Sequence, residues 1–428
     1  MATKWTEDQA AAIDSRNQSL LVAAAAGSGK TAVLTERIIQ RLKDKDHPLQ
    51  VQELLVTTFT KASAGEMKTR IGSALASELK KEDLDQETRK HLENQLKLLP
   101  SAQISTLHSF CQWVIQSYFY AADINPRARI GNDGEMALMR SDILHDLIVG
   151  AYDRLAKDPN DDPYHIYALA DIFSDDKSDA NLEELVLAIY TFAMAMANPK
   201  KWLLEALDDY RQVLDKPFLE TTWGSYFWQD MKGSMEGCQR HLEALRKMAE
   251  APMGIAKLDV YCDIVEAKYY PFQEAIKSGS WDDFYKAVAS LVTSDYKNYF
   301  SLTVKDDKSN SDDVAAKAKA KVHYEAVKDY LAGLKDSVFA ISEAAWREQV
   351  KAQIPILEGL INLTLDFKAA YDKAKHDGGL MDFNDLEHLC LKILVEPGTE
   401  NQDQPQPSQV AKELQGRFQE IMVDEYQD

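Results

Sequence analysis

The chain has 428 residues, of which 45% are hydrophobic, and a formal net charge of −20 at pH 7. This length and apolar content predict a folded protein with two or more domains. The acidic balance argues against wholesale electrostatic capture of nucleic acid, so any DNA contact has to come from a local groove. The sequence contains neither an apolar run of about 18 residues nor a basic leader followed by an apolar one, which predicts a cytoplasmic protein without a membrane span. The four cysteines form no CxxC pair, which argues against a cysteine-only metal site.

A phosphate-binding loop is predicted near the start of the chain, at AAAGSGKT (24–31). An apolar run before it predicts a strand, and the apolar spacing after it predicts a helix. The loop departs from the pattern G-x-x-x-x-G-K-[ST] only in having Ala24 at the first glycine. The alternative is an alanine-rich helix start with an incidental Gly-Lys pair. The residues expected to contact ATP here are Ala26, Gly27, Ser28, Gly29, Lys30 and Thr31, with Lys30 as the catalytic cation and Thr31 as a ligand of Mg²⁺.

The last residues of the chain, VDEYQD (423–428), follow an apolar strand and predict the second half of the same site. Asp424 is expected to bind Mg²⁺, and Glu425 to act as the general base on the attacking water. Gln427 is expected to hydrogen-bond near the γ-phosphate. An ordinary acidic turn is the alternative. Because the chain ends within this motif, we expect it to be the front portion of a longer protein.

Strands and helices alternate at both ends of the chain, which predicts an α/β fold with the parallel, RecA-like sheet of P-loop NTPases. Between them, every segment has a helical period, which predicts a large all-helical inserted domain. The expected strands are 19–24, 54–59, 102–107 and 418–425. The expected divisions are 1–131 as the first part of the motor domain, 132–380 as the helical insertion and 381–428 as the return to the motor domain.

Three further motifs resemble those of UvrD-like superfamily 1 helicases. They are TFTKASAGEMKTRI (58–71), ISTLHSFC (104–111) and MDFNDL (381–386). The resemblance implies the first motor domain of an ATP-dependent DNA helicase that acts on single-stranded and duplex DNA. In TFTKASA, WTEDQ and LMDFNDL the chain is similar to one subgroup, the AddA (RexA) subunits. These are helicase-nuclease subunits that process bacterial double-strand breaks with a second subunit, AddB or RexB, and carry a C-terminal nuclease domain.

The resemblance also implies nucleotide contacts outside the loop. A glutamine before the first strand reads the adenine edge in this family, and Gln9 of WTEDQ takes that place. Arg37, in the helix after the loop, is a weaker candidate for nucleotide contact, and a solvated helix arginine is the alternative. Asp382 and Asp385 are interpreted as capping or helix-packing residues without a catalytic role.

The DNA contacts implied by the resemblance come from two motifs. Phe59 is expected to stack on a base and Thr60 to bind a phosphate, because every base has a π-face and hydroxyl groups suit phosphate oxygens. Burial of Phe59 in the core is the alternative. Thr106 and His108 are expected to line the DNA floor, although a lone histidine is more often structural.

Two other functions stay open from the sequence alone. The chain could be a P-loop switch that binds a partner according to its nucleotide state, or a DNA-docking module without motor activity. UvrD-like motors complete their site with arginines from a second motor domain, so we expect these 428 residues alone to hydrolyse ATP at a near-background rate.

Overall fold

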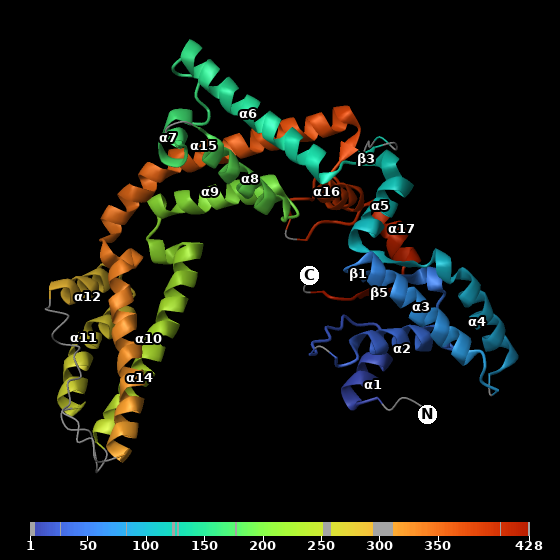
Figure 1. The fold of residues 1–428 in the computed structure, drawn as a ribbon, viewed down its shortest axis with the longest axis horizontal. Coiled ribbons are helices and arrows are strands. Elements are labelled where there is room, and N and C mark those ends of the chain that lie inside the picture. The colour runs from blue at the N-terminus through green and yellow to red at the C-terminus, as the bar shows by residue number, and fades with distance from the viewer. Residues whose placement is uncertain are drawn as a thin grey trace. The chain divides into compact units, whose positions relative to one another are not determined.

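The chain forms two compact units in the computed structural model (Figure 1). Unit 1 comprises residues 1–144, 191–199 and 367–428, and unit 2 comprises residues 145–190 and 200–366. The limits that we drew from the sequence, at 131/132 and 380/381, lie just outside two long helices, α6 (Asp133–Lys157) and α15 (Glu343–Gly378). The structure describes residues 5–25, 27–82, 84–121, 125, 128–175, 178–250, 258–293, 311–402 and 404–426.

Unit 1 is built on a small parallel sheet with the strand order β2-β1-β5. In register, Leu55 of β1 lies opposite Gln103 on one side and Ile421 on the other. These strands confirm three of the four that the sequence predicts, and their parallel pairing confirms the inferred direction. Their bounds are β1 (Leu54–Thr58), β2 (Gln103–Thr106) and β5 (Glu420–Val423).

The prediction of a strand at 19–24 is wrong: the structure describes all six residues, and none of them is in a strand. Leu20, Leu21 and Val22 are 47 to 77% exposed. Ile421 and Val423 of β5 are also exposed, at 64% and 49%. A strand is stable only when a neighbour pairs with its N–H and C=O groups. Apolar content alone therefore did not make this segment a strand.

Helices cover both faces of the sheet, because alternate residues of a strand point to opposite faces. Leu54 and Val56 pack into one cluster with Ile38 of α2 and Met67 of α3. Leu55 packs into the other cluster with α5, α16 and α17. The helices of unit 1 outside α6 and α15 are α1 (Glu7–Asp14), α2 (Lys30–Leu42), α3 (Lys61–Glu78), α4 (Gln86–Leu98), α5 (Leu107–Tyr118), α16 (Phe383–Leu394) and α17 (Gln409–Arg417). A further two-stranded parallel sheet, β3 (Arg129–Ile130) with β4 (Leu380–Met381), was not predicted.

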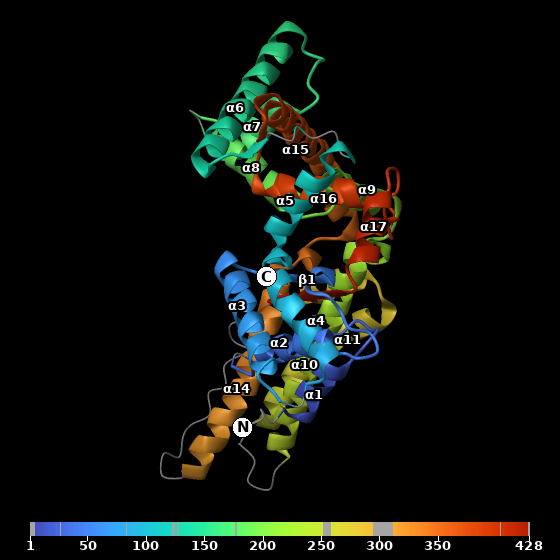
Figure 2. The same cartoon turned by 90° about the vertical axis from the view of Figure 1, so that its right-hand side faces the viewer.

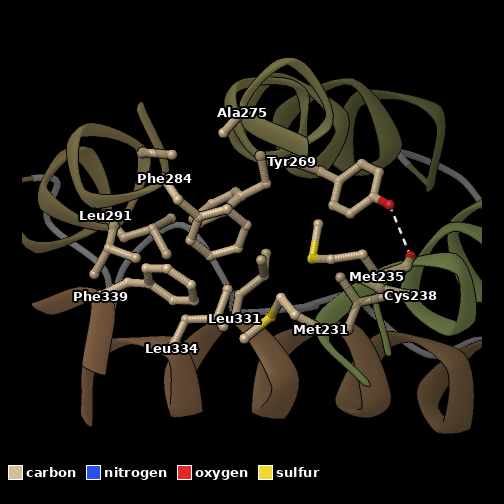
Figure 3. Close-up of a cluster of buried hydrophobic side chains, with 14 of the residues drawn as sticks. Met231, Met235, Cys238, Tyr269, Ala275, Phe284, Leu291, Leu331, Leu334 and Phe339 are labelled. Atoms are coloured by element: carbon tan, nitrogen blue, oxygen red, sulfur yellow. Dashed lines mark hydrogen bonds between the residues drawn. The ribbon is translucent and has the colours of Figure 1, made fainter. Parts of the chain in front are cut away.

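Unit 2 is helical in its described part, as the sequence predicts. Its α10 and α14 lie side by side in both whole-chain views (Figures 1 and 2). The core is aromatic: the ring of Phe284 lies 4.5 Å from that of Phe339, and the Tyr269 hydroxyl donates a hydrogen bond to the Met235 carbonyl (Figure 3). The remaining helices of the chain are α7 (Ile166–Phe173), α8 (Ala180–Met194), α9 (Pro199–Asp215), α10 (Thr222–Ala249), α11 (Leu258–Ser278), α12 (Trp281–Thr293) and α14 (Ser311–Gly333).

Among the described residues, no single helix is long and apolar enough to cross a membrane. One helix pair, α8 with α9, reaches the required length and apolar content only when the two are taken together, and it is bent by 111°.

Candidate nucleotide and DNA site

The loop before α2 has the backbone that a phosphate cradle needs. Gly27 and Gly29 adopt left-handed conformations, with φ of 79° and 86°, which residues with a Cβ avoid. Gly29 is the N-cap of α2, and no side chain caps the helix there, so the first N–H groups of α2 face the loop. The Lys30 ammonium donates to the Ala24 carbonyl at 2.9 Å, on the inner side of the loop. Ala26 lies outside the described residues.

Gln9 contacts this loop directly. Its side-chain N–H group donates to the Ser28 carbonyl at 3.0 Å, and its oxygen accepts from the Thr6 N–H at 3.0 Å. The second bond belongs to a capping box at the start of α1. The carboxamide therefore fixes α1 against the phosphate loop, and its contact with adenine stays a prediction.

Asp424 follows the last residue of β5, and its N–H group donates to the Thr57 carbonyl at 2.9 Å. Burial raises the pKa of the Asp424 carboxyl, and the neighbouring Glu425 carboxylate adds to the rise. The Lys30 ammonium lowers this pKa, which places it within electrostatic reach of Asp424. The fold thus brings the first and last predicted parts of the site together.

Glu425 has a φ of 56°, a left-handed backbone for a residue with a side chain. This conformation costs roughly 1–2 kcal/mol and is often found at functional sites. It turns the chain sharply after Asp424, which separates the directions of the two carboxylates. Gln427 lies outside the described residues.

These residues fit ATP with Mg²⁺. The carboxylate of Asp424 and the hydroxyl of Thr31 are hard oxygen donors of the kind that Mg²⁺ takes alongside phosphate oxygens. The two left-handed glycines and the start of α2 supply N–H groups, and Lys30 supplies a positive charge. When bound, the metal would neutralise phosphate charge.

Arg37 lies in a structural network and not in the loop. Its Nε donates to Glu420 at 2.5 Å, and one of its terminal nitrogens donates to the Ala12 carbonyl at 2.6 Å. Its side chain is 16% exposed, so it is not the solvated arginine that the sequence left as an alternative. Its contact with a nucleotide stays a prediction.

The predicted DNA residues lie where β1 and β2 end. Thr58 is opposite Thr106 in the sheet, so the next residues of both strands leave the same edge. Phe59 is 65% exposed, which excludes the alternative that it is buried in the core. Thr60 and Thr106 are the N-caps of α3 and α5, and each hydroxyl accepts a backbone N–H, from Ser63 and Ser109 respectively. Thr106 is 8% exposed, so only Thr60 of this pair offers an open hydroxyl surface.

His108 leads to a residue that the sequence analysis missed. Its Nε2 lies 3.3 Å from Glu387, and its ring stands edge-on to Phe383 at 5.6 Å. Phe383 is 53% exposed at the start of α16, beside a cavity of about 170 Å³. An apolar residue directly after a helix cap could have signalled this exposed place, because the first turn of a helix often faces solvent. Asp382 and Asp385 form the predicted capping box of α16.

Comparison with known sequences decides the family. The UvrD/REP helicase N-terminal domain matches residues 5–428. The chain belongs to the UvrD/REP helicase family. Among UvrD/REP relatives, it is 35% identical to an ATP-dependent helicase/nuclease subunit of Bacillus cytotoxicus, over 100% of this chain and 32% of the relative. The protein of the same name from Bacillus cereus strain AH187 is also 35% identical, over 33% of its length, and that of Bacillus thuringiensis subsp. konkukian is 34% identical.

The chain therefore spans about a third of the length of the curated relatives that it matches. These relatives confirm the resemblance to helicase-nuclease subunits that the motifs indicated. The family is ATP-dependent, which agrees with a phosphate loop at Lys30.

Proposed function

We propose that this chain is the first motor domain, with its helical insertion, of an ATP-driven DNA helicase subunit that takes part in double-strand-break processing. The observation that supports it most directly is the electrostatic pairing of Lys30 with Asp424, from opposite ends of the chain. The full protein would add a nuclease and pair with an AddB- or RexB-like second subunit. ATP and Mg²⁺ are its proposed cofactors.

Each polar group of the nucleotide site has one proposed task. The N–H groups of the loop and of the first turn of α2 hold the phosphates, and Lys30 balances their charge during binding and transfer. Asp424 and Thr31 hold Mg²⁺. Glu425 accepts a proton from the attacking water, which is the task of a general base.

A single strand of DNA is proposed to cross the edge where β1 and β2 end. The first turns of α3 and α5 contain only neutral or basic side chains, from Lys61 to Ser63 and from Leu107 to Ser109, so their N-termini suit phosphate groups. Phe59 and His108 offer ring surfaces beside them. We expect duplex DNA to bind elsewhere on the full protein.

The test compares two substitutions in ATP binding and hydrolysis. Lys30→Ala is expected to weaken binding of a fluorescent ATP analogue, because the phosphates lose their cation. Glu425→Gln is expected to bind ATP like the unaltered chain but to abolish turnover in a complex with both motor domains. Full turnover by Glu425→Gln would refute the base assignment.

A second measurement separates a motor from a nucleotide switch. Hydrolysis by the complete helicase subunit is expected to rise with single-stranded DNA, whereas a switch has no reason to respond to it. For this chain alone we expect near-background hydrolysis with or without DNA, because an arginine supplied across the cleft is worth about 10³ to 10⁵ in rate. Robust DNA-stimulated turnover by the chain alone would contradict the split site.

A further inference from the structure

The carboxylate of Glu420, at the start of β5, lies between two arginines of α2. Arg37 Nε donates to one carboxylate oxygen at 2.5 Å, and Arg41 Nε donates to the other at 2.7 Å. The three side chains are 11 to 16% exposed, so solvent and salt screen these ion pairs only in part. Charge-assisted bonds to both oxygens fix the orientation of the carboxylate as well as its position. The start of β5 is thus fastened to the second half of α2.

The opposite ends of the same two elements carry the catalytic pair. From Glu420 to Asp424 a strand advances about 13 Å. From Lys30 to Arg37 and Arg41 a helix advances about 10 and 16 Å. The distances match, so one contact between α2 and β5 lies at the ion pairs and the other at Lys30 and Asp424.

Apolar packing fills the stretch between these two contacts. Met422 lies on the same face of β5 as Glu420, because alternate residues of a strand share a face. It is buried in one cluster with Ile38 and Ile39 of α2. Apolar contacts are non-directional and allow small sliding movements, whereas the two ion pairs define one register between strand and helix.

Arg37 extends the same network to the phosphate loop. It donates to the Ala12 carbonyl of α1 at 2.6 Å, and Gln9 of α1 donates to the Ser28 carbonyl of the loop at 3.0 Å. The loop, α1, α2 and β5 therefore form a closed circuit of polar contacts. Glu420 is the member of the circuit that belongs to the acidic strand.

We propose that Glu420 is a positioning residue that acts through Arg37 and Arg41 to set the spacing between Lys30 and the Asp424 carboxylate. This inference rests on the proposed function. Its consequence is specific: without the charge of Glu420, the phosphate loop keeps its own contacts with ATP, but Asp424 is no longer held at the distance that a metal on the phosphates requires. Glu420 thereby controls the contribution of Mg²⁺ to ATP affinity and touches neither ligand.

The experiment measures affinity for a fluorescent ATP analogue with excess Mg²⁺ and with EDTA, in the unaltered chain and in Glu420→Gln. The matched control is Glu78→Gln. Glu78 is 14% exposed and also accepts from two cations, Lys43 and Lys81, each at 2.6 Å, but it joins α2 to α3 and not to β5. A comparable loss of melting temperature is expected in both variants, so stability alone cannot explain a difference between them.

In Glu420→Gln, affinity with Mg²⁺ is expected to fall about tenfold, the lower end of the range for partners that orient metal ligands. Affinity in EDTA is expected to stay unchanged, and Glu78→Gln to leave both values unchanged. Glu420→Asp, which keeps the charge, is expected to recover part of the loss. If Glu420→Gln does not fold, Arg41→Gln removes one of the two ion pairs and the same comparison applies.

Two results would overturn the proposal while the proposed function stands. One is an unaltered response to Mg²⁺ in a folded Glu420→Gln, and the other is an equal loss in Glu78→Gln. A fall of the same size with EDTA and with Mg²⁺ also overturns it, because Glu420 would then support the loop in general. Failure of the unaltered chain to bind ATP in either condition would refute the proposed function itself, and this inference with it.

Discussion

Replacing Lys375 by methionine should destabilise unit 1 strongly, in a way that acid partly reverses. The Lys375 ammonium is 2% exposed and lies 2.6 Å from Asp385 and 3.3 Å from each of Asp382 and Asp372. It also lies 4.3 Å from the centre of the Tyr371 ring. Burial alone would lower the pKa of Lys375, but the Asp385 and Asp382 carboxylates outweigh it and raise this pKa. Removal of the lysine leaves two buried carboxylates without a counter-charge.

The cost is expected to be about 3 to 5 kcal/mol at pH 7, the usual range when one partner of a buried ion pair is removed. At about 2–4 °C per kcal/mol for a domain of this size, the melting temperature should fall by about 6 to 20 °C. Lys368→Met is the matched control on the same helix. Lys368 pairs with Asp372 at 2.5 Å but is 28% exposed, so its loss should cost less than about 1 kcal/mol.

The dependence on pH tests the cause. Burial raises the pKa of Asp385, and Lys375 opposes this rise, so the pKa should climb further when the lysine is gone. A carboxyl whose folded pKa exceeds its unfolded value binds more protons when folded, so stability increases as pH falls. The gap between the unaltered chain and Lys375→Met should therefore narrow from pH 7 to pH 5, and Asp385→Asn added to the variant should recover stability. Urea titrations at both pH values measure it, and a gap that is small at pH 7 or widens in acid would refute the reasoning.

Three further predictions follow from other described contacts. Burial lowers the pKa of His241, and the nearby His323, whose Nδ1 lies 2.8 Å from the His241 Nδ1, adds to this effect; the unfolded chain then takes up protons first, so unit 2 should lose stability as pH falls below about 6.5, and His241→Phe should flatten that dependence in urea titrations. Phe284→Ala should cost about 3 to 5 kcal/mol in the melting of unit 2 without weakening ATP binding, because the ring is buried at 5.2 Å from Phe272, and normal melting would contradict this packing. Phe59→Ala should weaken single-strand binding by about 1 to 3 kcal/mol with unchanged melting, since the ring is exposed, and a lower melting temperature with intact DNA affinity would count against stacking.

Local sequence was enough for the parts of the site whose geometry depends on near neighbours. Gly27 and Gly29 take the left-handed conformations that a phosphate loop requires, because only glycine adopts them without cost. Thr60 and Thr106 end strands and cap helices, since a hydroxyl at that place accepts an N–H a few residues later. Three of four strands, and the helical character of the middle of the chain, followed from hydrophobic period.

The apolar run at 19–24 failed as a strand because a strand needs a partner, and pairing is not a property of the segment itself. The tertiary structure also decided which charges meet. Glu420 binds Arg37 and Arg41, and Lys375 gathers carboxylates from two helices, although nothing in their spacing singles them out. His108 meets Phe383 in the same way, across two helices. These contacts arise because the parallel sheet aligns its strand ends and packs helices across it, which brings residues from opposite ends of the chain within bonding distance.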